Sequence, residues 1–325
     1  MNYDDTLIEE FERFDFSNFQ VLYHPPRVFV CGGEYNTGKL VPASMRDRII
    51  QYFELNDDDD EYRLLSKSCV MAEDFKDYFK DGAYSDLMVF EDDIAKVSTL
   101  IIICLESPGS LVELGLLCNN SYLSKRLLVI APQSDVEAKD SFIYLGPLSS
   151  LVERDPSSVL IYPWPNNELQ EYEHIDLIAG DIKNKLRNTN KTSKFDIKNS
   201  AHIAFLIHDI IQISSPIKIT EIELALASIN VDINEKFIHR LLFLLEKINL
   251  IKFTTYSNVN YYYACNDEDR RIKFGRAKDN SKRDEGSIKM SIRRSFILDE
   301  NESSKKRRLA LKQISNIKRA LGGAQ

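Results

Sequence analysis

Two glutamates flank a proline-glycine turn, and this arrangement could support glycosyl transfer. Glu106 follows an apolar run at 98–104, Pro108 and Gly109 predict a turn, and Glu113 falls in the apolar segment that comes next. The transition state of glycosyl transfer resembles an oxocarbenium ion, which a carboxylate beneath the anomeric carbon stabilises. The sequence therefore nominates Glu113 and Glu106 as catalytic residues.

The same turn also has a purely structural interpretation. Ser110 is a candidate N-cap and Glu113 stands three residues later, at the capping-box position that satisfies free N–H groups at a helix start. Catalysis is favoured by the wider context of a buried strand, a terminal carboxylate, a glycine turn and a second carboxylate. Gly115 costs about 1 kcal/mol against alanine inside a helix, so we attribute it to a close approach of backbone or ligand.

The elements that must position this turn predict a Rossmann-like, open and mostly parallel α/β sheet over residues 26–190. Apolar runs alternate with segments of helical periodicity, as in a chain that alternates strand and helix. Strands are expected at 27–31, 68–72, 98–104, 126–130 and 159–162, and helices at 44–55, 75–80, 86–97, 110–119 and 175–186. Ligands of such sheets bind beyond the carboxyl ends of the strands, where Glu106 lies.

Three further patterns could bind ligands, and each has a simpler interpretation. The acidic stretch 56–61 is interpreted as a solvated loop, because nothing in it fixes the geometry of metal ligands. Gly38-Lys39 is followed by Leu40, so the hydroxyl that a P-loop offers to Mg²⁺ is missing. The five cysteines and five histidines are scattered without ligand spacing, so we expect reduced packing cysteines and no metal.

Beyond a polar linker at 188–194 the pattern changes to helices and one hairpin, which predicts an α+β winged helix-turn-helix domain over residues 200–265. The expected helices are 201–213, 220–227 and 234–248, and the expected strands are 250–255 and 260–264. The third helix offers Lys236 and Arg240 for nucleic-acid contacts. This basic set is sparse, so a domain used only for protein contact explains it equally well.

Residues 266–325 predict a basic C-terminal tail with a terminal helix at 305–321. They hold 17 Lys and Arg against 9 Asp and Glu, a net charge of +8, whereas residues 1–265 carry −16. Such asymmetry suggests a nucleic acid or another polyanion near the tail, although contact with the protein's own acidic surface explains it nearly as well. The nominated residues are Arg270, Arg271, Arg293, Arg294, Lys305, Lys306, Arg307 and Arg308.

The start of the chain indicates neither secretion nor membrane insertion. Residues 1–25 are acidic and aromatic, and they predict an N-terminal arm that packs on another part of the protein. They lack the basic and apolar regions of a signal peptide, and the chain has no apolar run of about 18 residues. We expect a cytoplasmic protein without membrane contact.

The segment 109–115 resembles the G-[ST]-x-x-E-L-G signature of nucleoside 2-deoxyribosyltransferase-like proteins. In that family the glutamate of the E-L-G triplet is the nucleophile toward the sugar, which implies this role for Glu113 and a supporting role for Glu106. The strand and Gly-Gly turn at 31–33 resemble the turn under base and sugar, although the double glycine departs from the transferase pattern. The resemblance implies ligand contacts from Gly32, Gly33, Asn36, Ser107, Gly109 and Ser110, with Asp86, Asp92 and Asp93 as weaker candidates.

The domain order, together with the motifs at 31–33, 37–42 and 106–110, is similar to that of effector proteins of bacterial retrons. This resemblance implies a toxin of anti-phage defence that associates with a reverse transcriptase and its multicopy RNA–DNA, in a complex that could form higher oligomers. It further implies cleavage of NAD, as substrate and not cofactor, at the nicotinamide–ribose bond. The alternatives are a deoxyribosyltransferase or hydrolase of other nucleotides, and a nucleotide-sensing DNA-binding regulator without turnover.

Overall fold

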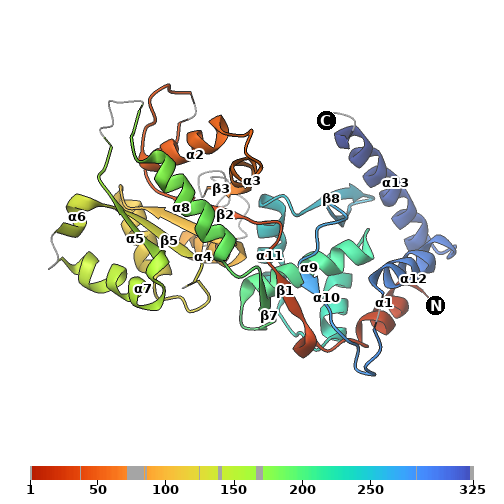
Figure 1. Ribbon diagram of the computed structural model, residues 1–325. Helices are drawn as coiled ribbons and strands as arrows, with labels where there is room; N and C mark the ends of the chain where they lie inside the picture. Colours follow the sequence, from red (N-terminus) through yellow and green to blue (C-terminus); the bar gives the residue numbers. More distant parts are fainter. Residues whose placement is uncertain are drawn as a thin grey trace. The chain divides into compact units, whose positions relative to one another are not determined.

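The structure, a computed structural model, describes residues 2–36, 38–71, 84, 86–123, 125–137, 141–165, 171–282 and 284–322. The chain divides into two compact units. The central unit is Tyr23–Lys191, and the terminal unit combines Met1–Leu22 with Thr192–Gln325. Figure 1 shows the elements of both units, coloured along the chain.

The central unit contains a parallel five-stranded sheet in the order β3-β2-β4-β5-β6. Its strands are β2 (Val28–Cys31), β3 (Cys69–Val70), β4 (Leu100–Cys104), β5 (Leu127–Pro132) and β6 (Val159–Tyr162). The middle strand, β4, is buried along its whole length, as a strand covered on both faces must be. The predicted parallel α/β sheet is confirmed.

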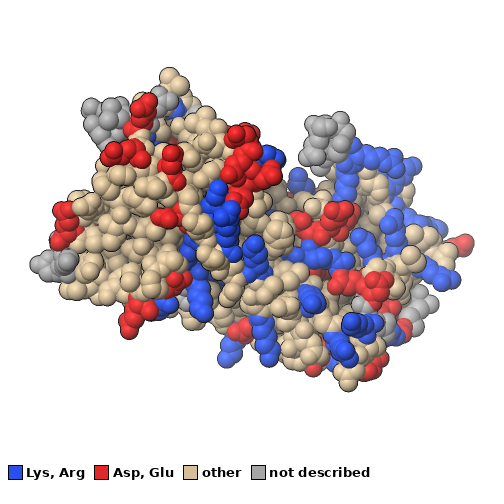
Figure 2. Space-filling view, in the orientation of Figure 1, with Lys and Arg blue, Asp and Glu red and all other residues tan. Residues whose placement is uncertain are grey.

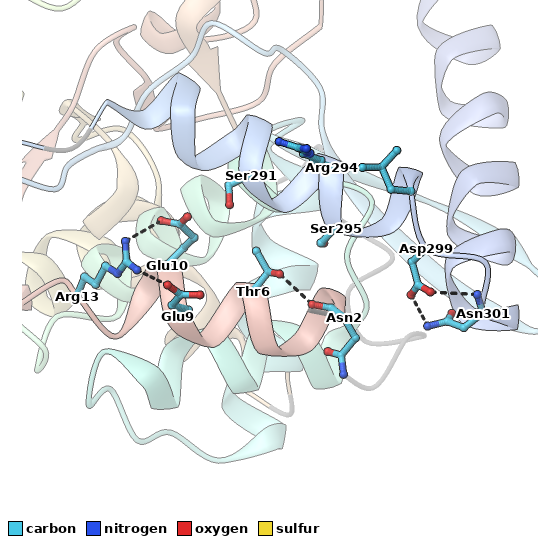
Figure 3. A pocket seen from close by; sticks show the side chains of 11 residues that line it. Asn2, Thr6, Glu9, Glu10, Arg13, Ser291, Arg294, Ser295, Asp299 and Asn301 are labelled. Carbon is cyan, nitrogen blue, oxygen red and sulfur yellow. Dashed lines mark hydrogen bonds and ion pairs between the residues drawn. The ribbon is translucent and has the colours of Figure 1, made fainter.

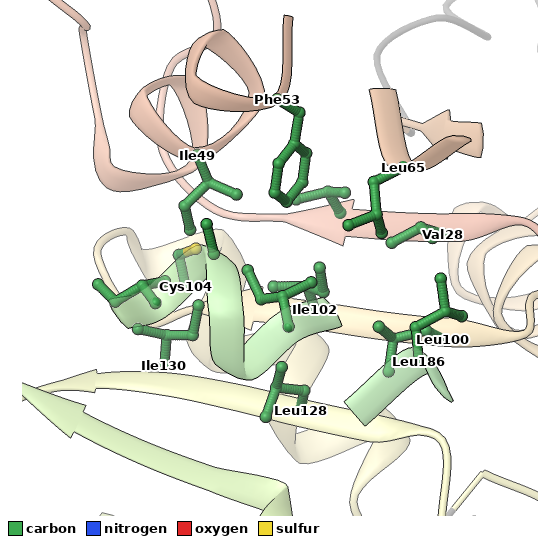
Figure 4. Close-up of a cluster of buried hydrophobic side chains, with 14 of the residues drawn as sticks. Val28, Ile49, Phe53, Leu65, Leu100, Ile102, Cys104, Leu128, Ile130 and Leu186 are labelled. Carbon is green, nitrogen blue, oxygen red and sulfur yellow. The ribbon is translucent and has the colours of Figure 1, made fainter. Parts of the chain in front are cut away.

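Helices cover this sheet (Figure 1). On one face α2 (Met45–Leu55), α3 (Asp60–Ser68) and α8 (Ile175–Asn188) contribute to a buried apolar cluster with β2, β4 and β5, which includes Ile49, Phe53, Ile102 and Leu186 (Figure 4). The unit also contains α4 (Leu87–Val97), α5 (Pro108–Leu117), α6 (Gln133–Glu137) and α7 (Ser149–Arg154), with the short helical turns η3 (Tyr144–Leu148) and η4 (Pro156–Ser158). The helix expected at 75–80 lies outside the described residues.

The acidic stretch at 56–61 starts a helix, so its interpretation as a loop was wrong in its second half. Asp59 is the N-cap of α3, and its carboxylate accepts the backbone N–H groups of Glu61 at 2.8 Å and Tyr62 at 3.3 Å. Asp60 and Glu61 occupy the first turn, where negative charge interacts favourably with the helix dipole. In a run of acidic residues, the sequence alone does not show which aspartate caps the helix.

Buried Lys185 of α8 fastens the turn before β6. Its ammonium donates to Asp155 at 2.8 Å and to the hydroxyls of Ser157 and Ser158 at 2.9 and 3.1 Å. Burial alone would raise the pKa of Asp155, but the hydrogen bonds from Lys185 and Ser157 lower it from 3.8 to about 2. This carboxylate therefore stabilises the fold only while it is ionised.

A pH profile of stability should report this pair. A depressed carboxyl pKa contributes stability above its unfolded value, and that contribution disappears as the pH falls through the folded value. We expect the free energy of unfolding of the chain to lose up to about 2 kcal/mol between pH values of about 4 and about 2 from Asp155. Urea unfolding across this range measures it. Lys185→Met should flatten this part of the profile, and an equally steep profile in the variant would contradict the assignment.

The terminal unit joins both ends of the chain in a small antiparallel sheet. Its middle strand, β1 (Gln20–Leu22), pairs with β7 (Thr192–Lys194) on one side and with β10 (Ile272–Lys273) on the other. The first helix, α1 (Tyr3–Phe11), packs against α10 (Ile219–Ser228) and α12 (Glu285–Ile297), and η1 (Phe16–Asn18) leads into β1. Residues 2–22 are therefore part of a folded unit.

The wholly buried helix α9 (Ser200–Ser214) is the core of the terminal unit. After it come α10 (Ile219–Ser228), α11 (Glu235–Lys247) and the hairpin of β8 (Ile251–Tyr256) and β9 (Val259–Ala264). Ser257 and Asn258 form the hairpin turn, and both have positive φ, as a two-residue type I′ turn requires. The sequence predicted these three helices and this hairpin in the order observed.

The stretch with the basic composition is also folded. It contains β10, α12 (Glu285–Ile297) and α13 (Glu302–Gly322), and α12 packs on α9 while α13 packs on β8. Within the described ranges, no helix has the length and apolarity that crossing a bilayer requires.

Candidate active site

Helix α5, which follows the turn after β4, begins at Pro108, two residues before the start at 110 that the sequence suggested. Ser107, with an extended backbone, is the N-cap, and Pro108 is the first helical residue. This corrects the N-cap assignment of Ser110, because a residue before proline is biased toward extended conformations while proline fits the first helical position. Ser110 completes the capping box instead: its buried hydroxyl accepts the N–H groups of Glu106 at 3.2 Å and Ser107 at 3.1 Å.

Glu106 fastens three segments around the turn. Its Oε1 accepts the backbone N–H groups of Gly33 at 2.8 Å and Arg46 at 3.0 Å, and its Oε2 accepts that of Met45 at 2.6 Å. Met45 and Arg46 are the first residues of α2, so the carboxylate lies at a helix N-terminus, where anions are favoured. Both carboxylate oxygens accept backbone N–H groups, so Glu106 holds these segments together.

The double glycine after β2 is explained by this arrangement. A Cβ at Gly32 would lie 2.8 Å from both Glu106 Oε1 and Arg46 Cβ, and a Cβ at Gly33 would lie 2.8 Å from Ser44 Cβ. Only glycine lets the turn approach Glu106 and α2 this closely. Close packing of protein on protein therefore accounts for the departure from the transferase pattern.

Glu113 lies in the second turn of α5, half-buried and close to the end of β2. There the buried Cys31 thiol has a pKa well above its usual range, first because of burial and next because of the nearby Glu113 carboxylate, to which it also hydrogen-bonds. The negative charge of Glu91, in α4, raises this pKa as well, whereas the buried cation Arg46 lowers it. Glu113 thus belongs to a group with two further charged residues that the sequence did not single out.

A cavity of about 640 Å³ opens at the carboxyl end of the sheet beside this turn. Three of the predicted ligand-binding or catalytic residues line it: Gly33, Glu106 and Ser107. Asn36 instead accepts the N–H of Gly38 at 3.1 Å, and Asp86 is the N-cap of α4, accepting the N–H of Met88 at 2.8 Å. Gly109, in the first turn of α5, is exposed.

Asp92 and Asp93 have structural partners in α4 and its surroundings. Asp92 accepts hydrogen bonds from Lys96 at 2.5 Å and Asn120 at 2.9 Å. Asp93 is buried and accepts one from the Tyr84 hydroxyl at 2.8 Å. These contacts account for both aspartates without a ligand.

Within the described part of the chain, no protein segment approaches Gly115 closely, so of the two explanations that the sequence suggested only the approach of a ligand stays a prediction. An added Cβ at Gly115 would meet no atom of the described residues within 4 Å. We expect Gly115→Ala to raise the free energy of unfolding by about 1 kcal/mol, because alanine is the better helix former. Chemical denaturation of the two proteins measures the difference. A loss of stability would show that a neighbour of this position excludes a methyl group.

The basic residues of the terminal unit fall into two groups. Lys236, Arg293, Arg294, Lys305 and Lys306 are exposed, and in Figure 2 basic side chains follow α13. Arg240 lies over the Phe237 ring at 4.6 Å, and Arg270 is paired with Glu285. Arg308 donates to the carbonyl oxygens of Phe296 and Asp299 and so caps the end of α12.

Two arginines are corrected from nucleic-acid contacts to interior residues. Arg271 and Arg307 are each only 1% exposed. The guanidinium of Arg271 stacks on Phe205, and that of Arg307 pairs with buried Glu221 and lies 3.4 Å from the centre of the Tyr3 ring. Neither can reach a phosphate in this fold, because both side chains are buried. A basic run in a sequence does not reveal which of its side chains point inward.

Another cavity of about 640 Å³ lies between α1 and α12 of the terminal unit (Figure 3). Arg13 pairs with Glu9 and lies 4.0 Å from Glu10 in an ion pair, while Asp299 accepts from the side chain of Asn301. The charged groups that line this cavity largely compensate one another. Arg294, one of the exposed basic residues, lines its edge.

Comparisons with known proteins connect the chain to retrons. A family model described as "STM3845 retron effector protein" matches residues 42–253. The chain is 31% identical over 218 residues to the Escherichia coli protein named "Retron Ec86 putative ribosyltransferase/DNA-binding protein", covering 63% of this chain and 66% of that protein. It is 27% identical over 213 residues to "Retron Ec73 putative ribosyltransferase/DNA-binding protein", also of Escherichia coli, covering 60% and 64%. Each match spans just under two thirds of the relative's length.

Proposed function

Because the chain belongs to the STM3845 retron effector family, we propose that it is the toxic effector of a retron anti-phage system and that it hydrolyses the nicotinamide–ribose bond of NAD. The matched residues include the turn after β4 and helices α9 to α11. The word ribosyltransferase in the names of both relatives supports chemistry at the anomeric carbon. The observation that carries the proposal is a half-buried carboxylate, Glu113, beside the carboxyl end of the sheet.

In this reaction Glu113 attacks C1 of the ribose or stabilises the oxocarbenium ion formed there. The electron pair of the N-glycosidic bond leaves with nicotinamide, which departs neutral because it carried a positive charge, so no general acid is needed. Water then bonds to C1 and releases one proton, and where Glu113 has bonded to C1 that bond breaks and its electron pair returns to the carboxylate, so the product is ADP-ribose. Glu106 holds the turn through its three N–H contacts, and the protonated Cys31 thiol donates to Glu113 as a weak hydrogen-bond donor.

The terminal unit is proposed to connect this enzyme with its partners in the cytoplasm, a reverse transcriptase and multicopy RNA–DNA. The order of α9, α10, α11 and the β8–β9 hairpin matches that of a winged helix-turn-helix domain, and the relatives' names include DNA binding. The exposed lysines and arginines of α12 and α13 suit phosphate contacts that read no sequence. These contacts weaken steeply with added salt.

Incubation of the chain, alone and in its nucleoprotein complex, with NAD tests the enzymatic proposal. We expect nicotinamide and ADP-ribose to be released in equal amounts. Chromatography of the reaction mixture measures both products. Parallel reactions with deoxynucleosides and a second free base distinguish hydrolysis of NAD from transfer between bases. Failure of both preparations to release nicotinamide would overturn the proposed substrate.

A further inference from the structure

A third cavity, of about 880 Å³, lies in the central unit beside the one at the turn. It is formed by residues along α2 as far as its last residue, Leu55, by the chain that follows β6 and by the start of α8. Trp164 lines both cavities. The two linings are also adjacent along the chain, because Pro42 lines this cavity and Ala43 and Ser44 line the other. The two cavities are therefore neighbours that share a wall.

The lining of this aromatic cavity is suited to a planar ring. Trp164, Tyr52 and Tyr172 contribute half-buried aromatic side chains that pack on the edge of the core. Arg48 is only 4% exposed, and its guanidinium lies 5.8 Å from the centre of the Tyr172 ring. Nucleobases stack on aromatic side chains and on guanidinium planes in this way, whatever their sequence identity.

Polar groups at the rim complete the set. The Tyr52 hydroxyl hydrogen-bonds to Asp176, and Glu173 lies 3.3 Å from the ring of His174. Carboxylates accept hydrogen bonds from ribose hydroxyls and from the amino group of a base. Burial and this hydrogen bond raise the pKa of Tyr52 to about 12, so its phenol remains a neutral donor. An aromatic floor with a carboxylate rim fits a nucleoside better than a phosphate.

We propose that the aromatic cavity binds the base of a second nucleoside moiety, so that the substrate cleaved at the turn after β4 is a dinucleotide that spans both cavities. The identification of the substrate as a dinucleotide rests on the proposed function. Each cavity falls within the size range of small-ligand sites, roughly 300–1,000 Å³. A mononucleotide would occupy only one of the two cavities. It would not account for the wall at Trp164 that the two cavities share.

The chain has a single tryptophan, so its intrinsic fluorescence reports on the shared wall directly. We expect adenosine and AMP to quench the Trp164 fluorescence of the full-length Glu113→Gln variant saturably, whereas ribose 5-phosphate, which has no base, should not. No dependence on the base would overturn the proposal. This titration needs no turnover and uses no substitution within the cavity.

Variants then separate the two cavities. Tyr172→Ala, which alters only the aromatic cavity, should weaken adenosine binding at least about fivefold, since it removes one stacking partner. Tyr172→Phe keeps the ring and should bind nearly as the parent does, as should Leu177→Ala, an exposed change in α8 outside both linings. Leu111→Ala alters only the cavity at the turn. If Leu111→Ala weakened binding and Tyr172→Ala did not, the base would lie in the wrong cavity and the proposal would fail.

Turnover distinguishes this inference from the proposed function. In the parent protein, Tyr172→Ala should raise KM for NAD and leave kcat and the cleavage of nicotinamide mononucleotide, which lacks the second nucleoside, unchanged. Equal effects on both substrates would refute the assignment of the cavity. If neither substrate is cleaved while base-dependent quenching persists, the proposed reaction fails and the nucleoside site remains.

Discussion

Glu113→Gln is expected to reduce the rate of nicotinamide release by about three orders of magnitude or more, as removal of a nucleophile does in other enzymes. The amide keeps the size of the side chain but cannot form a bond to C1 or balance a developing positive charge. Because Glu113 is half-buried at a helix surface, the substitution should leave thermal unfolding nearly unchanged. Initial rates of the purified variant, with its melting curve, measure both quantities.

Two controls make this prediction specific. Glu153→Gln makes the same chemical change at an exposed position of the central unit and should retain full activity. Glu106→Gln should instead lower stability, because an amide nitrogen would face the backbone N–H groups that both carboxylate oxygens now accept. Full activity of Glu113→Gln would refute the assigned mechanism, and loss of activity in Glu106→Gln without loss of stability would transfer the catalytic role to Glu106.

The largest expected change in stability concerns Arg307. Its Nη2 donates to Glu221 Oε1 at 2.5 Å and its Nη1 to Glu221 Oε2 at 3.1 Å, and both side chains are nearly fully buried. Arg307→Met would leave the Glu221 charge buried, with Lys218 at 2.9 Å as its remaining ion-pair partner among the described residues. Removing one partner of a buried ion pair costs about 3–5 kcal/mol. We expect a loss of stability at the lower end of this range, measured by urea unfolding.

The exposed Arg293→Met is the matched control, and we expect its stability to change by no more than about 0.5 kcal/mol. Adding Glu221→Gln to Arg307→Met should recover part of the loss, because the stranded charge is removed. If Arg307→Met were as stable as the parent but bound nucleic acid more weakly, Arg307 would be a nucleic-acid contact and its assignment as an interior residue would be wrong.

Local patterns were sufficient for the sheet and for the order of the helices. A buried parallel strand such as 100–104 is a continuous apolar run, and the turn at Ser257-Asn258 has residue types that tolerate positive φ. The position of Glu113 in a helix after a strand followed from the same reasoning. Its catalytic role stays a prediction.

Long-range contacts escaped the sequence because they join residues far apart in the chain. No residue close to Glu106 in the sequence indicates that its oxygens accept the backbone N–H groups of residues 33, 45 and 46. Ser107 and Ser110 stand three residues apart, so the N-cap is ambiguous until the geometry of Pro108 is considered. Likewise Arg307 stands in a basic run, and its partner Glu221 is 86 residues away.

The β1 strand has a consequence for how the protein is made. Both of its neighbours, β7 and β10, are encoded after the whole central unit, and domains tend to fold as units in the order of synthesis. On the ribosome, the central unit can therefore fold first while the opening 22 residues wait for their partners. During translation, the proposed toxin would therefore be folded before the unit that is proposed to tether it.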